Sequence, residues 1–363
     1  SPLSAAAKSV TEPAGRLLLG TKVGSSSFYT GAEFSFSVTT SPPRYATTTF
    51  PEFRINDIRR IILVVEQTPF QIDIGKGFVS NTQDFNIDII GEYSVVTDTI
   101  NGIDEAFLMN ISKTVELIRT SETNFAEEGG IDAVVIASFT NVGRYFIEAA
   151  KKINYMPKAI YVSSFYLPDF QKLDPSLTAF VCGCDVIAPG IAFRGNYFGS
   201  YEDFQSAFNS YRPDLGLGDA NHAIGAVSGL LLMQAIVSAN SLDDYEVTRA
   251  LGRINEETFF GPYQFGSDHS QLRFVPFLQF APDIESYTKA AKLNSSQFTN
   301  SINIVGPSRV QLQNLIYPVP TWDQRKFNPQ YVTAEYVIMG ITAGNFRSNQ
   351  KFLNFVFSFC LFH

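Results

Sequence analysis

A regular alternation of short apolar runs with amphipathic segments, between residues 60 and 211, limits the fold of this chain more than any other feature. The run Arg60–Glu66 (RIILVVE) is apolar over most of its length, which is typical of a parallel strand buried on both faces of a sheet. Residues 106–120 instead carry apolar side chains at helical spacing. This alternation predicts an open, mostly parallel α/β sheet. Strands are predicted at residues 16–19, 34–40, 60–66, 87–96, 132–138, 158–163, 179–187 and 274–280, and helices at residues 70–82, 106–120, 141–153, 204–211, 220–239 and 243–253.

The size and charge of the chain narrow its class. With 363 residues, 45% of them hydrophobic, the chain is long enough for two domains that each have a core. Its net charge of −8 lacks the basic surface that nucleic-acid binding requires, so we exclude nucleic acid as a partner. We expect no signal peptide, because the sequence opens with SPLSAAA. We also expect no complete transmembrane helix, because there is no apolar run of about 20 residues, and residues 352–362 are very apolar but too short to span a bilayer.

Motifs of catalytic and cofactor sites are missing from the sequence. Gly75-Lys76-Gly77 lacks the third glycine of a dinucleotide fingerprint, and residues 225–229 (GAVSG) differ in spacing from a nucleophile elbow. Three scattered histidines offer few groups for acid–base chemistry or for metal binding, and Cys182 and Cys184 fit small buried residues of one strand. We therefore expect no metal, cofactor or catalytic residues.

Four segments occur together in the order found in one known family. They are residues 132–137 (DAVVIA), residues 156–160 (MPKAI), the long helix at 220–239 and residues 260–265 (FGPYQF). In this order and spacing the chain resembles the type I periplasmic binding proteins, which include branched-chain amino-acid binders and the ligand-binding regions of related receptors. The resemblance implies an α/β fold of two Rossmann-like lobes, with mostly parallel sheets joined by hinge crossings.

The register of this resemblance gives the expected lobe boundaries. Lobe I takes residues 1–42 and 218–272, lobe II takes residues 43–217 and 273–316, and residues 317–363 form a C-terminal extension. Family members begin with a strand, a long helix and a second strand, so the resemblance implies that roughly the first quarter of a complete module is missing. A truncated product that cannot complete the core of lobe I is therefore an open alternative.

Family members bind their ligand in the cleft between the lobes. By position, Ser1 and Ser4 correspond to a serine-rich loop, where hydroxyls and free backbone N–H groups at a helix N-terminus suit a carboxylate. The resemblance also makes the loop at 21–27 a second contact, where hydroxyls and carbonyls meet the ligand amine. Which of Thr21, Ser25 and Ser26 makes this contact stays open.

The resemblance implies these ligand-binding residues: Ser1, Ser4, Thr21, Ser25, Ser26, Ser138, Phe139, Ser164 and Phe165. Some of these residues also have a purely structural alternative. Ser1 fits a plain helix cap and the serine run at 25–27 fits a solvated turn. Phe139 and Phe165 fit plain packing.

The resemblance also gives an expected ligand and role. Branched-chain binders place an acidic residue near position 165 to meet the ligand ammonium, whereas Asp169 is the nearest acidic residue here. The ligand therefore need not be an ordinary α-amino acid. We expect a small amino-acid-like ligand bound by hinge closure. The Phe-rich tail favours the extracellular, membrane-associated sensor region of a receptor-like signalling protein, with a homodimer among its assemblies. The alternatives are the substrate-binding component of an amino-acid ABC transporter, which docks on a permease, and a Rossmann-type enzyme.

Overall fold

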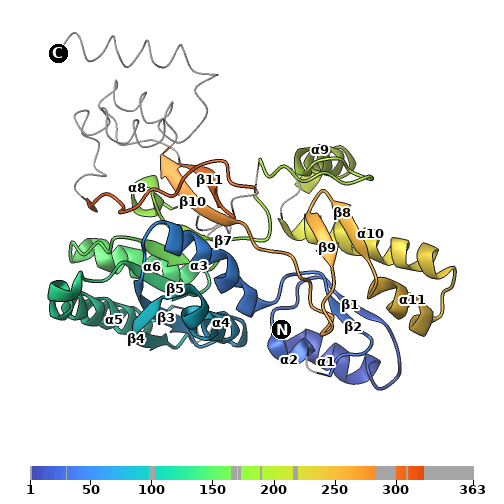
Figure 1. Cartoon of the computed structure of the whole chain (residues 1–363), viewed down its shortest axis with the longest axis horizontal. Coiled ribbons are helices and arrows are strands. Elements are labelled where there is room, and N and C mark those ends of the chain that lie inside the picture. Colours follow the sequence, from blue (N-terminus) through green and yellow to red (C-terminus); the bar gives the residue numbers. More distant parts are fainter. Residues whose placement is uncertain are drawn as a thin grey trace, which may run out of the picture.

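The computed structural model describes residues 2–29, 31–97, 103–164, 170, 173–188, 190–215, 220–282, 300–307 and 310–322. Figure 1 shows two halves of unequal size, which extended segments of the chain connect. The larger half is built on a seven-stranded sheet, and the smaller half contains a two-stranded parallel sheet and a β-hairpin. This is the predicted α/β architecture with mostly parallel strands.

The large sheet has the strand order β11-β10-β7-β6-β5-β3-β4. The strands from β7 to β4 pair in parallel, and β10 is antiparallel to both of its neighbours. Successive side chains of β3 enter opposite cores, since Ile62 joins one buried cluster and Ile61 the other. A strand buried on both faces produces a continuous apolar run, which is why the sequence predicted it. The strands are β3 (Arg60–Glu66), β4 (Asp88–Val95), β5 (Ala133–Ala137), β6 (Ile160–Val162), β7 (Cys182–Cys184), β10 (Phe277–Pro282) and β11 (Asn300–Gly306).

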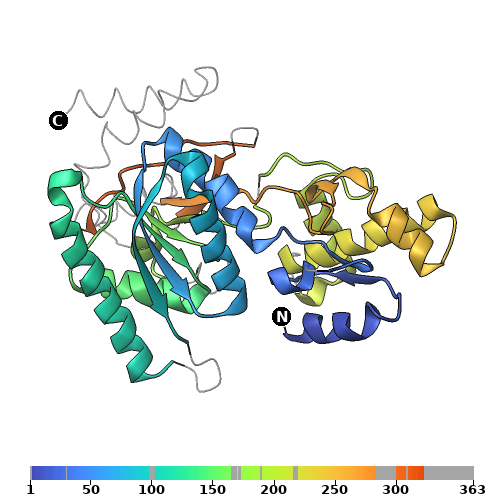
Figure 2. The same cartoon turned by 60° about the horizontal axis from the view of Figure 1, so that its bottom comes forward.

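Helices cover both faces of this sheet. The helices α3 and α4 pack on one face, where Phe50 and Phe78 belong to an aromatic-rich cluster with Tyr161 of β6. On the other face α5 and α6 contribute Ile118 and Phe146 to the second cluster. Figure 2 shows the sheet between these two pairs of helices. The helices of this half are α3 (Tyr45–Ile55), α4 (Pro69–Phe85), α5 (Glu105–Asn124), α6 (Thr140–Lys152) and the short α8 (Pro175–Thr178).

The two cysteines of β7 lie on one face of their strand, as the sequence predicted. Cys182 and Cys184 belong to the cluster beneath α3, each is buried, and both are free thiols. The hydroxyl of Thr49 in α3 lies 3.4 Å from the Sγ of Cys184. The two thiols therefore act as small packing groups; Cys360 lies outside the described residues.

A buried carboxyl on α3 predicts a pH-dependent stability. Glu52 is 3% exposed, and burial raises its pKa to about 7. A carboxyl whose pKa is higher in the folded than in the unfolded state binds its proton more tightly when folded. The stability that Glu52 contributes is therefore greatest below about pH 4.5 and is lost as the pH rises towards 7.

We expect the free energy of unfolding of Glu52→Gln, taken relative to that of the wild type, to be roughly 1–3 kcal/mol higher at pH 8 than at pH 5. Urea denaturation of both proteins at the two pH values measures this difference. Glu116→Gln on the exposed side of α5 is the control, because Glu116 is about half exposed and is expected to change nothing between the two pH values. An equal pH dependence for Glu52→Gln and the wild type would contradict the assignment.

The smaller half combines segments that are far apart in the sequence. Its strands β1 (Leu18–Gly20) and β2 (Ser35–Ser37) pair in parallel. Asp244 at the start of α11 accepts hydrogen bonds from the guanidinium of Arg16 at 2.7 Å and from the backbone N–H of Leu17 at 3.0 Å, which ties α11 to the residues before β1. The other elements of this half are α1 (Pro2–Thr11), α2 (Ser26–Tyr29), α9 (Tyr201–Tyr211), α10 (Ala220–Ala239), α11 (Asp244–Leu251), β8 (Asn255–Thr258) and β9 (Gly261–Gln264).

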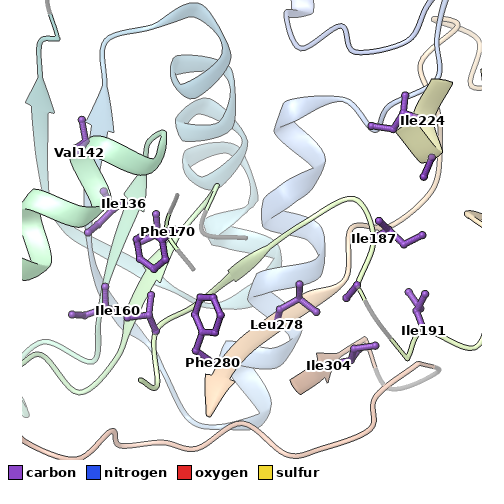
Figure 3. Packing of buried hydrophobic residues seen from close by; sticks show 14 of the residues in the cluster. Ile136, Val142, Ile160, Phe170, Ile187, Ile191, Ile224, Leu278, Phe280 and Ile304 are labelled. Atoms are coloured by element: carbon purple, nitrogen blue, oxygen red, sulfur yellow. The ribbon is translucent and has the colours of Figure 1, made fainter. Parts of the chain in front are cut away.

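Three segments, at residues 38–44, at 185–188 with 190–200, and at 265–276, run between the halves. The first and third are held together, because the hydroxyl of Thr40 donates to the carbonyl of Arg273 at 3.1 Å and Thr40 forms an isolated parallel β-bridge with Gln271. One core cluster continues across this junction, as Figure 3 shows. Its labelled members are Ile136, Val142, Ile160, Phe170, Leu278, Phe280 and Ile304 in the larger half, Ile187 and Ile191 in the second connecting segment, and Ile224 of α10.

The packing of α9 bears on where the lobes divide. The expected boundary near residue 217 places α9 in lobe II. In the structure the Phe204 ring stacks on Phe259 at 4.7 Å, and the Phe208 ring lies 4.4 Å from that of His222 in α10. Figure 1 likewise shows α9 beside α10 and β8. We therefore propose that the division lies within the second connecting segment, before residue 200, so that α9 belongs to lobe I.

The start of the expected C-terminal extension packs on the larger half. The indole N–H of Trp322 donates to the carbonyl of Tyr155 at 2.7 Å, and the backbone N–H of Val319 donates to the carbonyl of Lys158 at 2.8 Å. Residues 317–322 are therefore held against the larger half. The rest of the extension, residues 323–363, lies outside the described residues.

One helix requires a correction to the expectation that no segment could span a membrane. By length and composition alone, α10 is long and apolar enough to do so. A core helix passes the same test, and Val227 and Leu231 of α10 are fully buried in the core cluster that Figure 3 samples. Of this apolar stretch of α10, 33% is buried, so packing within the smaller half accounts for part of its apolar sequence.

Candidate functional site

The candidate site lies where the strand ends of the larger half face a loop of the smaller half. Because β3, β5 and β6 are parallel, their carboxyl ends, at Glu66, Ala137 and Val162, meet at one edge of the sheet. The loop at residues 21–27 of the smaller half approaches the first turns of α4, which follows β3. Ligands of open α/β sheets bind outside the carboxyl ends of the strands, so this edge is the expected crevice.

Two contacts join the halves across this crevice. The backbone N–H of Ser26 donates to the Oδ2 of Asp73 in α4 at 2.7 Å. A Cβ added to Gly24 would lie only 2.2 Å from the Cδ2 of Phe70, so the backbone of Gly24 lies against that ring. The loop at 21–27 and the start of α4 are thus in direct contact where the two halves meet.

Aromatic rings line the wall of the larger half. The rings of Phe70 and Phe139 stack with centroids 5.7 Å apart and an interplanar angle of 15°. Tyr45 at the start of α3 meets Phe70 edge-on at 6.1 Å. Phe139 remains 40% exposed, whereas most large aromatic side chains of this half are buried. The Phe139 ring therefore leaves an apolar surface exposed at this edge of the sheet.

A buried polar network lies behind these rings. The hydroxyl of Ser163 donates to the Oε1 of Gln71 at 2.8 Å and accepts from the backbone N–H of Ser138 at 3.0 Å. The Nε2 of Gln71 donates to the hydroxyl of Ser164 at 3.5 Å. Gln71, Ser138 and Ser163 are at most 1% exposed, so they fix the strand ends, while Ser164 is only partly buried.

Glu66 at the end of β3 fixes the position of Phe139. Its carboxylate accepts from the backbone N–H of Phe139 at 2.7 Å and from the hydroxyl of Thr97 at 3.0 Å. Burial raises the pKa of Glu66, and these two hydrogen bonds partly offset the rise. A negative charge at the N-terminus of α6 is favourable because the helix dipole is positive there. Glu66 thereby fixes the backbone of Phe139, whose ring stacks on Phe70.

The structure brings some of the predicted residues together and separates others. Ser26 and Phe139 both contact α4, because Ser26 donates to Asp73 and the Phe139 ring stacks on Phe70. Ser138 and Ser164 join the hydrogen-bond network of Gln71. Thr21 is exposed, Ser4 is partly buried in the first turn of α1, and the hydroxyl of Ser25 lies 2.8 Å from that of Ser27. Ser1 and Phe165 lie outside the described residues, as does Asp169.

Three residues of α4 belong to the site but were not predicted from the sequence: Phe70, Gln71 and Asp73. The signal that could have found them was present. The sequence predicts β3 at residues 60–66 followed by a helix from residue 70, and the first residues after a parallel strand lie at the ligand edge of the sheet. The start of that helix was the place to look.

Comparison with known proteins agrees with this architecture. A family model for periplasmic binding proteins matches residues 1–280. The chain belongs to the periplasmic binding protein family. The resemblance predicted from the sequence and the predicted fold class are thereby confirmed. Membership of this family indicates a non-catalytic, extracytoplasmic binding protein, and it disfavours the Rossmann-type enzyme.

Solved structures of bacterial solute-binding proteins share the fold of this periplasmic binding protein. One from Brucella ovis, a leucine-, isoleucine-, valine-, threonine- and alanine-binding protein in a closed conformation, matches with a TM-score of 0.60 and 12% identity over 86% of this chain and 71% of that one. An ABC transporter protein from Desulfitobacterium hafniense in complex with Leu matches with a TM-score of 0.59 and 14% identity over 82% and 77%. One from R. palustris in complex with benzoate matches with a TM-score of 0.59 and 11% identity over 80% and 72%.

Proposed function

We propose that this chain is the solute-binding component of an ABC transporter and that it binds a small carboxylic acid, either an amino acid or an aromatic acid, in the cleft between its halves. The proteins of similar fold that bind Leu or benzoate are transport components, which supports this alternative over the receptor-like sensor that the tail of the sequence favoured. A permease is then the expected macromolecular partner.

The observation that carries the proposal is that both halves contribute to one site. The loop at 21–27 offers the backbone N–H of Ser26, and a carboxylate already accepts from it at 2.7 Å, namely that of Asp73. The same position suits the carboxylate of a ligand. Phe139 offers an apolar ring next to it, and Ser164 a hydroxyl. A ligand bound here would contact both halves.

A melting experiment tests the proposal. We expect a compound among leucine, other amino acids, benzoate and hydroxybenzoates to raise the melting temperature, because a ligand at 100 times its Kd stabilises the native state by about 2.7 kcal/mol. Phe139→Ala is expected to weaken this ligand at least about tenfold, since it removes the exposed ring.

Tyr211→Ala is the matched control, because Tyr211 is an 83% exposed ring on α9. It is expected to leave the ligand-induced shift unchanged. The proposal fails if no compound of these classes shifts the melting temperature at millimolar concentration, or if Phe139→Ala binds as well as the wild type.

A further inference from the structure

A charged contact joins the two halves. Asp73 is 7% exposed, and its carboxylate accepts a hydrogen bond from the backbone N–H of Ser26, which belongs to the other half. At 2.7 Å this is a charge-assisted hydrogen bond, which is stronger than a bond between neutral groups. The bond cannot survive a separation of the halves by a few ångströms.

A steric contact beside this bond depends on a glycine. A Cβ on Gly24 would lie 2.2 Å from the Cδ2 and 2.6 Å from the Cε2 of Phe70, which is far inside van der Waals contact. The backbone of Gly24 is outside the left-handed region, so space rather than conformation requires glycine here. The close approach of Phe70 is therefore a second feature that needs the halves together.

We propose that Asp73 and Phe70 form a latch with Ser26 and Gly24 that holds the ligand-free protein closed. The carboxylate of Asp73 takes the backbone N–H that the proposed function assigns to the ligand, so the ligand competes with the latch for one donor. When the latch opens, the Nζ of Lys76, 3.7 Å from the Oδ1 of Asp73, remains as the partner of the carboxylate. Only the competition step rests on the proposed function, because the latch itself acts without ligand.

The latch is tested by measuring the distance between the halves in the ligand-free protein. Spin labels at Leu117→Cys of α5 and Leu242→Cys beyond α10 report this distance, since both positions are exposed and lie on different halves. The background carries Cys360→Ser, and the buried Cys182 and Cys184 are protected from labelling. We expect one dominant short distance in the otherwise wild-type protein.

Two variants open the latch by different routes. Asp73→Ala removes the acceptor, and Gly24→Ala introduces a methyl group where Phe70 lies. Each is expected to raise the ratio of open to closed protein about tenfold, equivalent to about 1.4 kcal/mol. Asp84→Ala, an exposed acid at the far end of the same helix, is the control and is expected to leave the distance unchanged. Cooperative melting of each variant verifies that it folds.

The outcomes separate the latch from the proposed function. If the distance distributions of Asp73→Ala and Gly24→Ala equal that of the wild type, or if the ligand-free wild type is already open, the latch is overturned even where leucine or benzoate binds. If both variants open the cleft while neither compound binds any of the proteins, the latch stands and the proposed ligand class fails. If a compound binds, we expect Asp73→Ala to associate with it several-fold faster.

Discussion

We expect Gly77→Ala to destabilise the protein by about 3 kcal/mol, although alanine is normally the better helix former. Gly77 lies in the middle of α4, where the helix crosses the first connecting segment. A Cβ at this position would lie 2.3 Å from the carbonyl oxygen and 2.4 Å from the Cα of Pro43. Because these are backbone atoms, no side-chain rotation can relieve the overlap, and α4 must move away from the segment.

Urea denaturation of Gly77→Ala and of the matched control Gly225→Ala measures this effect. Gly225 also lies within a helix, α10, but a Cβ there would meet no atom within 4 Å. The control is therefore expected to gain about 0.5–1 kcal/mol from helix propensity. Equal effects of the two substitutions would contradict the packing of α4 on Pro43. Since α4 also carries Phe70 and Asp73, its displacement is expected to weaken ligand binding as well.

Phe50→Ala is expected to cost about 3–5 kcal/mol, because it removes the centre of the aromatic cluster beneath α3. Phe50 is fully buried, and its ring lies 5.2 Å from that of Phe78, 5.9 Å from that of Phe85 and 6.3 Å from that of Phe53. The ring joins α3 to α4 and to the sheet below them, so the cavity left by alanine cannot close without moving two helices.

Ile55→Ala on the same helix is the control for Phe50→Ala. Ile55 is 72% exposed, so its truncation is expected to change the free energy of unfolding by less than about 0.5 kcal/mol. Calorimetric or urea unfolding of both variants measures these changes in the free energy of unfolding. A loss below 1 kcal/mol for Phe50→Ala would show that α3 does not pack on the sheet as described.

The fold of the larger half was predictable wherever one local signal decided the structure. The run at 60–66 is continuous and apolar because β3 is buried on both faces, and it is the strand that forms. Helix α3 was missed, since Thr47, Thr48 and Thr49 are β-branched and Pro51 lies within it, so local propensity opposes a helix. Its burial of Phe50 outweighs that propensity, which only the tertiary structure reveals.

The candidate site was predictable in part for the same reason. The hydroxyl-rich loop at 21–27 and the strand ends at Ser138 and Ser164 are visible in the sequence as polar groups after apolar runs. Asp73 was not visible, because it is one acid on an amphipathic helix, and its partner Ser26 is 47 positions away. Contacts between halves depend on how the halves are placed, and no local pattern encodes that placement.

The most direct test of the central claim is a calorimetric titration of the purified chain with leucine and, separately, with benzoate. The account predicts that one of them binds at one site per chain with a Kd in the micromolar range, and that Phe139→Ala weakens it at least about tenfold while Tyr211→Ala does not. Absence of saturable heat with both compounds at millimolar concentration, or equal binding by Phe139→Ala, would contradict a ligand cleft between Ser26 and Phe139.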